Sequence, residues 1–301
     1  MNELTILLSL KDRSEDTKKW YVNNYHKDFN YIIADGSIGN ENQEIFSQIS
    51  HENLIYLRIN KDVAYNDFYK KVYDASLMVK TPFVMQVDND DVINFLGIKE
   101  CLQKINQDNS ISLISGHIAG FNFINGKYYL SDFKENECND ISNNDNFNQI
   151  ESYLKNYRII WYSIYRTKIF QKAWEDCVLF SCKCYINTEI IHGLSSLVNG
   201  KFYFYNNTTY LRNTNQPNST YKNMSLKESK EEIKTELFQI LSYIFKKYKL
   251  DKNKVFEFHH KGKITHKRRN ILSRIILTLI RKKPQSISQI INKLNKLNFI
   301  S

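Results

Sequence analysis

Residues 82–91 read Pro82-Phe83-Val84-Met85-Gln86-Val87-Asp88-Asn89-Asp90-Asp91. Four of the five residues before Asp88 are apolar, which predicts a strand buried on both faces, as in a parallel sheet covered by helices. The acids follow at the carboxyl end of that strand, where open α/β sheets bind their ligands. Carboxylates this close repel one another unless a cation lies between them, and a divalent ion with oxygen ligands suits that position. Because Asp and Asn also end strands by forming turns, this stretch alone leaves a metal site and a turn as alternatives.

Apolar strands and amphipathic helices alternate through the first part of the chain. A helix is predicted after Ser14, and the other predicted elements are strands at 5–10, 29–34, 53–59 and 111–115 and helices at 65–79 and 98–105. The repeat of roughly 25–30 residues is the βαβ rhythm of a mostly parallel sheet. We therefore expect an α/β, Rossmann-like fold with helices flanking the sheet.

The pattern changes in the second half of the chain. Residues 138–149 are acidic and rich in Asn and predict a surface excursion, and aromatic strands or helices resume at 157–165. An apolar helix is predicted from Asn187 to Asn199, followed by strands at 202–205 and 208–212. A capping box at 225–228 predicts the start of a long amphipathic helix that continues to Tyr248.

Composition favours a folded intracellular protein. The chain has 301 residues, of which 42% are hydrophobic, so it supplies a substantial core and is not predicted to be disordered. The odd number of cysteines, five, and the lack of a signal-peptide pattern predict a reducing cytoplasm. Cys177, Cys182 and Cys184 lie close together in sequence, but without a metal-knuckle spacing we expect buried free thiols.

The positive charge is concentrated at the C-terminus. The net charge is +10, and residues 252–301 contain 13 Lys and Arg against the single acid Glu257. The apolar positions at 271–280 are too few to span a bilayer, so the segment is predicted to lie on an anionic membrane surface or to pack on the rest of the protein. A basic residue near anionic lipid contributes roughly 1 kcal/mol. Nucleic acid is not expected as a partner, because the aromatic residues do not interleave with the basic clusters.

Four features occur in an order that resembles GT-A glycosyltransferases, in particular bacterial family 2-like enzymes. They are residues 11–13 after the first strand, residues 35–37 after the second, residues 80–91, and a later helix that begins at Glu189 and ends before Gly200-Lys201-Phe202. The acidic stretch is of the D-x-D class. The resemblance covers roughly residues 3–215. It implies a catalytic domain at 1–220, with a nucleotide-sugar half at about 1–115 and an acceptor half at about 116–220, and an amphipathic helical basic extension at 221–301.

The resemblance also implies roles for particular residues. Asp90 and Asp88 would hold Mn²⁺ or Mg²⁺, with Asp91 either a further ligand or a helix N-cap. The donor nucleotide-sugar would be bound by Lys11, Arg13, Asp35, Asp88, Asn89 and Arg212, with Asp35 at the base, Asp88 at the ribose or sugar, and Arg212 at the diphosphate.

The general base of such an enzyme is a carboxylate that takes the acceptor hydroxyl's proton. Glu189 is the first candidate, although a first-turn acid is also favoured simply by the helix dipole. Glu175 and Asp176 are the alternatives. We expect His192 to be a surface or capping residue rather than a member of the site.

The resemblance implies a metal-dependent transferase that moves a sugar from a nucleotide-sugar, with a UDP-sugar favoured, to a hydroxyl of a cell-surface glycan such as capsule or lipopolysaccharide, with inversion. The acceptor would be a glycan or lipid-linked glycan, and the expected location is cytoplasmic, peripheral on the inner face of the cytoplasmic membrane. One alternative is a sugar nucleotidyltransferase, which usually has a Gly-rich loop after its first strand that residues 11–14 lack. Another is a non-catalytic nucleic-acid or membrane binder.

Overall fold

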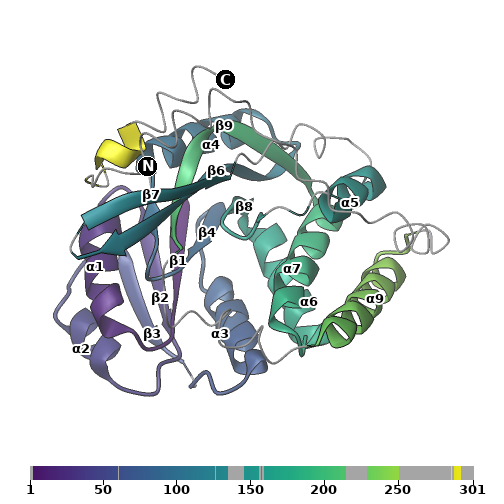
Figure 1. The fold of residues 1–301 in the computed structure, drawn as a ribbon, viewed down its shortest axis with the longest axis horizontal. Coiled ribbons are helices and arrows are strands. Elements are labelled where there is room, and N and C mark those ends of the chain that lie inside the picture. Colours follow the sequence, from purple (N-terminus) through teal and green to yellow (C-terminus); the bar gives the residue numbers. More distant parts are fainter. Residues whose placement is uncertain are drawn as a thin grey trace.

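The protein is built around one twisted sheet whose first half is parallel (Figure 1). The computed structural model describes residues 3–59, 61–125, 127–134, 146–155, 157, 159–214, 229–250, 286 and 288–292. Within these ranges the sheet has nine strands in the order β3-β2-β1-β4-β8-β6-β9-β5, and β7 pairs with β6. The predicted α/β class with a mostly parallel sheet flanked by helices is confirmed.

The parallel half contains the four strands that the sequence predicts. They are β1 (Leu4–Leu10), β2 (Asn30–Asp35), β3 (Leu54–Arg58) and β4 (Phe83–Val87). Every residue of β1 and β4 is buried, as expected for strands covered on both faces. The helices that connect these strands are α1 (Ser14–Asn24), α2 (Glu41–Ser47) and α3 (Tyr65–Leu77).

The order of the parallel strands creates a crevice. β2 and β4 pair with opposite edges of β1. The chain therefore adds β2 and β3 on one side of β1 and then reverses direction across the sheet to add β4 on the other side. Right-handed crossovers then put α1 and α2 on one face and α3 on the other. Ligands of such sheets bind at the carboxyl ends of the strands where this reversal occurs. Here the ends of β1 and β4 lead directly into Arg13 and the acidic turn, the name used below for residues 88–91.

The second half of the sheet is mixed. β5 (Val92–Ile93) and α4 (Phe95–Gln107) lead into β6 (Ile111–Ile124), which forms a hairpin with β7 (Lys127–Lys134) and also pairs with β8 (Ile164–Arg166) and β9 (Lys201–Asn213). The sequence predicts that the strand beginning at Ile111 ends at residue 115, which is too early. β9 is one irregular strand rather than two, with register shifts against β6.

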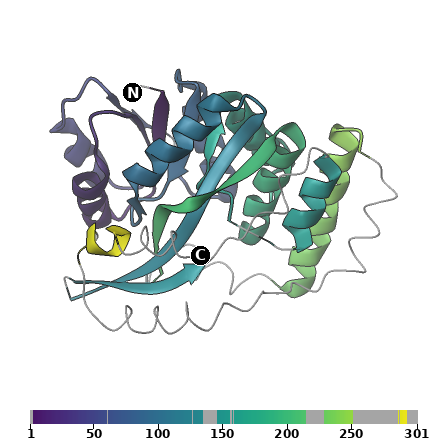
Figure 2. The same cartoon turned by 90° about the horizontal axis from the view of Figure 1, so that it is seen from above.

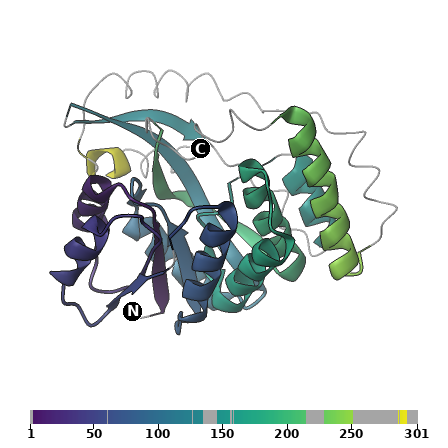
Figure 3. The same cartoon turned by 90° about the horizontal axis from the view of Figure 1, so that it is seen from below.

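Four helices, α5, α6, α7 and α9, continue one face of the sheet toward the C-terminal part of the described chain. α6 (Thr167–Phe180) packs on α3, α7 (Tyr185–Asn199) packs on α6, and α5 (Asn146–Lys155) and α9 (Lys230–Lys247) pack on α7. Figure 3 shows α3, the α6–α7 pair and α9 following one another across the molecule. α9 begins with a capping box of Ser229 and Glu232. The predicted capping box at 225–228 lies outside the described residues.

A buried carboxylate fixes α9 in place. The Asp176 side chain is fully buried and accepts hydrogen bonds from Ser195 on α7 and from Tyr243 and Tyr248 of the α9 region, and it pairs with Lys247. Glu236 of α9 accepts hydrogen bonds from the backbone N–H groups that precede α7. α9 is therefore joined to α6 and α7 through polar as well as apolar contacts.

The last described segment, residues 288–292, packs on the other side of the molecule. Ile290 is buried in a small core with Ala119, Phe121, Leu130 and Leu211, which belong to β6, β7 and β9. Figure 2 shows this segment and α9 at opposite ends of the molecule. The apolar positions at 271–280, within the predicted helical extension, lie outside the described residues. None of the helices within the described ranges is long and apolar enough to cross a membrane.

Candidate functional site

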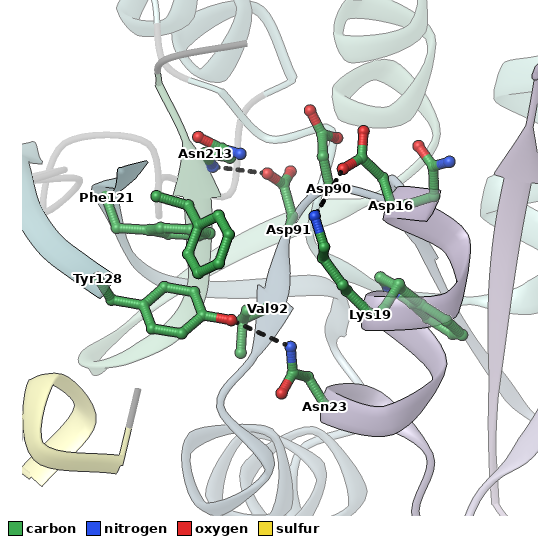
Figure 4. Close-up of a pocket in the computed structure, with 12 residues that line it drawn as sticks. Asp16, Lys19, Asn23, Asp90, Asp91, Val92, Phe121, Tyr128 and Asn213 are labelled. Atoms are coloured by element: carbon green, nitrogen blue, oxygen red, sulfur yellow. Dashed lines mark hydrogen bonds and ion pairs between the residues drawn. The ribbon is translucent and has the colours of Figure 1, made fainter. Parts of the chain in front are cut away.

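The acidic turn brings three carboxylates to one point. Asp88, Asp90 and Asp91 each offer a carboxylate oxygen, and these oxygens lie within 4.8 Å of one another. They project at the crevice beside β1, and Figure 4 shows Asp90 and Asp91 next to α1 and the end of β9. Oxygen ligands at this spacing suit a hard divalent cation. The arrangement fits the D-x-D motif of the GT-A class.

The surroundings of the acidic turn favour the binding of a divalent cation there. Burial and the neighbouring Asp90 charge raise the pKa of Asp88, and the same causes raise the pKa of Asp91 well above its ordinary value. The Arg13 guanidinium interacts with Asp90, Asp88 and Asp16, and the Arg212 guanidinium interacts with Asp91, Glu189 and Asp88. A divalent ion held by the three carboxylates of the turn would remove their mutual repulsion. The residues present therefore fit a divalent cation.

Arg13 supplies one of the two guanidinium groups. Its Nη1 donates to Asp90 Oδ2 at 3.0 Å, and its Nη2 donates to Asn89 Oδ1 at 2.6 Å. The structure therefore brings Arg13 to the acidic turn, and the donor-binding role of Arg13 and Asn89 stays a prediction.

Asp91 is not the N-cap of a helix. The next helix, α4, begins at Phe95 with Asn94 at its N-cap position. The Asp91 carboxylate instead accepts a hydrogen bond from the backbone N–H of Asn213 at 2.7 Å, and its side chain is buried. Of the two predicted alternatives, the structure favours membership of the carboxylate cluster.

Two stacked tyrosines hold Asp88. The Tyr162 hydroxyl donates to Asp88 Oδ2 at 2.6 Å, and the backbone N–H of Asp88 donates to the Tyr210 hydroxyl at 3.1 Å. The two rings stack with centroids 4.3 Å apart. This contact connects β9 to the end of β4 and fixes the direction of the Asp88 side chain.

Arg212 of β9 and Glu189 of α7 interact with the cluster and with each other. The Arg212 guanidinium lies over the Tyr162 ring, 5.9 Å from its centroid. Its pKa is raised most by Tyr162, with further contributions from Asp91, Glu189 and Asp88 that outweigh burial. Arg212 therefore interacts electrostatically with the other four groups.

Glu189 is in the second turn of α7, because the helix begins at Tyr185 rather than at the predicted Asn187, so it is not a first-turn acid, and it has a hydroxyl partner. The Tyr157 hydroxyl donates a hydrogen bond to Glu189 Oε2, and the Tyr153 hydroxyl donates to the Glu189 carbonyl oxygen at 3.2 Å. The other two candidate bases are elsewhere. Asp176 is occupied by the contacts that hold α9, and Glu175 pairs with Lys172 on α6. The structure brings Glu189 to Arg212 and does not bring Glu175 or Asp176 there.

Asp35 organises the loop that follows β2. Its side chain is fully buried and accepts hydrogen bonds from the Ser37 N–H at 2.8 Å, from the Tyr56 hydroxyl at 2.6 Å and from Arg58 at 2.8 Å. The structure thus places Asp35 at the carboxyl end of β2 with both carboxylate oxygens engaged by this chain's own groups.

Lys11, directly after β1, lies near the buried ion pair of Lys71 and Asp62. Lys71 pairs with Asp62 and also donates to the Leu10 carbonyl oxygen at 2.7 Å. Lys11 interacts with both charged groups. A Cβ atom at Gly36 would lie 2.4 Å from Asp62 Oδ1, so the close approach requires glycine at this position.

His192 is neither a surface residue nor a capping residue, so that prediction is wrong. It is buried, and burial lowers its pKa to about 3. Its ring contacts the rings of Trp161, Tyr165, Phe170 and Trp174. An imidazole held neutral among aromatic rings belongs to the core between α6 and α7.

Four cysteines are buried free thiols, as predicted for three of them. They are Cys101, Cys177, Cys182 and Cys184, and burial raises the pKa of the Cys177 thiol well above its ordinary value. Cys138 lies outside the described residues.

A cavity of about 200 Å³ adjoins the acidic turn (Figure 4). It lies between α1 and the β6–β7 hairpin, and its lining includes Asp16, Lys19, Asn23, Phe121 and Tyr128. Asp90 and Asp91 form its end nearest the crevice. The carboxylate cluster is therefore reached from the surface along this side as well.

The fold is that of GT-A glycosyltransferases. No protein-family model and no curated protein matches the chain. Among solved structures, the chain is similar to S. aureus TarS 1–349 in complex with UDP, with a TM-score of 0.56, 14% identity, and coverage of 86% of this chain and 69% of that one. For S. aureus TarS 1–349 in complex with UDP-GlcNAc the TM-score is 0.52 at 16% identity, and the match covers 81% of this chain and 65% of that one. For S. aureus TarS 1–349 alone the TM-score is 0.50 at 17% identity, and the match covers 88% of this chain and 76% of that one.

Sequence reasoning missed the three tyrosines that hold the carboxylates. Tyr157, Tyr162 and Tyr210 lie in stretches where tyrosine is frequent, and the chain contains 20 of them. Their hydroxyls act on residues that are distant in sequence, so no local spacing identifies them. The only feature of the sequence that pointed to these tyrosines was the high number of tyrosines in the chain.

Removing the Asp91 charge should stabilise the metal-free protein. Because the pKa of Asp91 is raised on folding, the folded state binds its proton more tightly, and stability is lost as the pH rises through the raised pKa. Asp91→Asn keeps an oxygen for the Asn213 N–H, so at pH 7.5 it should raise the free energy of unfolding by about 0.5–2 kcal/mol. Urea unfolding without metal at pH 7.5 and at pH 4 measures this, and the gain should shrink at pH 4. A less stable variant at pH 7.5 would contradict the account.

Proposed function

We propose that this chain is a metal-dependent glycosyltransferase that transfers a sugar from a UDP-sugar to a hydroxyl of a cell-surface glycan, with inversion. The observation that carries the proposal is the cluster of Asp88, Asp90 and Asp91 at the crevice of a GT-A fold. The choice of uridine is supported by the TarS structures, which contain UDP and UDP-GlcNAc.

The chemistry requires charge stabilisation at the leaving group. Asp90, with Asp88 and Asp91, would hold the metal, which when bound acts as a Lewis acid for the developing charge on the diphosphate. Arg212 would donate to the diphosphate oxygens, since its planar fork suits them. Tyr162 keeps the Asp88 carboxylate directed into the site.

Glu189 would take the proton of the acceptor hydroxyl as that oxygen attacks the anomeric carbon. Tyr157 holds its carboxylate by a hydrogen bond. Attack from the face opposite the leaving diphosphate inverts the configuration at the anomeric carbon. Lys11 and Asp35 would contact the nucleoside, from their places at the ends of β1 and β2.

A nucleotide and a metal should stabilise the protein together. In a thermal-shift screen of nucleoside diphosphates and nucleotide-sugars, a uridine compound with Mn²⁺ should raise the melting temperature more than either does alone. Asp90→Asn should abolish this increase, and Glu175→Gln, an acid-to-amide change at a half-buried position of α6, should preserve it. If no nucleoside diphosphate stabilises the protein with Mn²⁺, the transferase proposal fails.

The base assignment predicts a separation of activity from stability. Glu189→Gln should lower the release of UDP from the active UDP-sugar by about 10²–10⁴-fold while nucleotide binding persists. Asp176→Asn is the matched control, because it should cost about 2–4 kcal/mol of stability through the loss of contacts to α9 and leave the turnover of folded protein unchanged. Turnover that survives in Glu189→Gln and is lost in folded Asp176→Asn would reverse the assignment.

We also propose that residues 262–301 contact an anionic membrane surface, which would place the activity at the inner face of the cytoplasmic membrane. The support is the charge of this part of the sequence. Replacing the basic clusters at 267–269 and 281–283 with glutamine leaves Ile290 and its core contacts unchanged. Flotation with phosphatidylglycerol-containing liposomes should be lost in that variant, and unchanged flotation would exclude the proposal.

A further inference from the structure

Arg13 reaches the acidic turn from an unusual backbone position. Asp12 and Arg13 both have φ of 55°, in the left-handed region that residues other than glycine rarely adopt. Two successive residues in this conformation turn the chain sharply between β1 and α1. A backbone of this kind persists only where the surroundings hold it, and such positions cluster at functional sites.

The contacts of Asp12 hold one side of this turn. The Asp12 N–H donates to Ser37 Oγ at 2.7 Å, its carboxylate accepts from the Ile38 N–H at 3.0 Å, and its carbonyl oxygen accepts from Asn42 at 3.0 Å. The loop that carries Arg13 is thereby fixed to the loop after β2, on the nucleoside side of the crevice.

The acidic turn holds the other side. The Asn89 side-chain amide donates to the Arg13 carbonyl oxygen at 3.3 Å and to Thr17 Oγ1 at 3.0 Å, and its oxygen accepts from the Arg13 guanidinium. Asn89 therefore binds both the backbone and the side chain of Arg13. The position of the guanidinium beside Asp90 is built by two loops and does not depend on a single surface ion pair.

The guanidinium has the position and charge of a counter-ion for the cluster. It contacts Asp90 directly, and it interacts electrostatically with Asp88. The Asp90 side chain is 11% exposed and that of Arg13 is 28% exposed, so the pair is only partly screened by water. A divalent cation held by the same carboxylates would repel the guanidinium at close range.

We propose that Arg13 is an exchangeable counter-ion, which pairs with Asp90 before the metal binds and is transferred to the diphosphate of the nucleotide when the metal takes its place. The exchange leaves each charge with a partner in both states. This proposal rests on the proposed function, because the diphosphate of the nucleotide binds the released guanidinium through charge-assisted hydrogen bonds. Arg13 thus couples metal binding to nucleotide binding.

The proposal predicts two effects of opposite sign in Arg13→Gln. Without nucleotide, isothermal titration with MnCl₂ should give an affinity roughly three- to tenfold higher than in the wild type, because the competing charge is gone. With saturating Mn²⁺, titration with UDP should give an affinity on the order of tenfold lower, because a donor to the diphosphate is gone. Lys99→Gln is the matched control, since Lys99 is about as exposed as Arg13 and pairs at 3.1 Å with Asp28, which is not part of the cluster, and it should change neither affinity.

Two further results decide the proposal. Arg13→Lys keeps the positive charge but loses the planar, two-pronged guanidinium, so its Mn²⁺ affinity should stay near that of the wild type while its UDP affinity falls. If circular dichroism shows that Arg13→Gln is unfolded, Arg13→Lys is used in its place. A Mn²⁺ affinity that is unchanged or weaker in Arg13→Gln would overturn the proposal and make Arg13 an orienting partner of Asp90. Failure of the proposed function is distinguishable, because there the wild type would bind no UDP in the presence of Mn²⁺.

Discussion

The crowding of Asp88, Asp90 and Asp91 at the end of β4 is the constraint on which the arrangement of the site depends. Three carboxylates within 4.8 Å of one another are unfavourable in a partly buried crevice, and the raised pKa values of Asp88 and Asp91 express that cost. A fold tolerates such a cluster where it gains a function from it. The order of β2, β1 and β4 puts the cluster at the reversal of the sheet, where a ligand can reach it.

The surrounding elements each contribute one restraint on these acids. β9 supplies Tyr210 and the N–H of Asn213, the segment before β8 supplies Tyr162, and the loop after β1 supplies Arg13. The mixed half of the sheet therefore does more than extend the core, because it brings groups distant in sequence to the end of a parallel strand. Arg212 of β9 interacts with Asp88, with Asp91 and with Glu189 of α7.

The sequence predicts the parallel half of this fold well and the mixed half poorly. β1 and β4 are continuous apolar runs between polar ends, so local pattern is sufficient to find them and to place Asp88 and Asp90 at a strand end. β6 continues past residue 115 because it pairs with β7 and β9, and pairing partners are not visible in a local pattern. Asp176 resembles a site acid in sequence, but its partners in α9 lie about seventy residues away. His192 is buried by aromatic rings from other elements for the same reason.

The central claim is that the acidic turn binds a divalent metal together with a nucleotide diphosphate. Anomalous diffraction from a crystal grown with MnCl₂ and UDP tests it most directly. The account predicts one manganese peak among the carboxylates of Asp88, Asp90 and Asp91, with the diphosphate beside it. UDP bound in the crevice without a manganese peak at these carboxylates, or a peak at another group of residues, would contradict it.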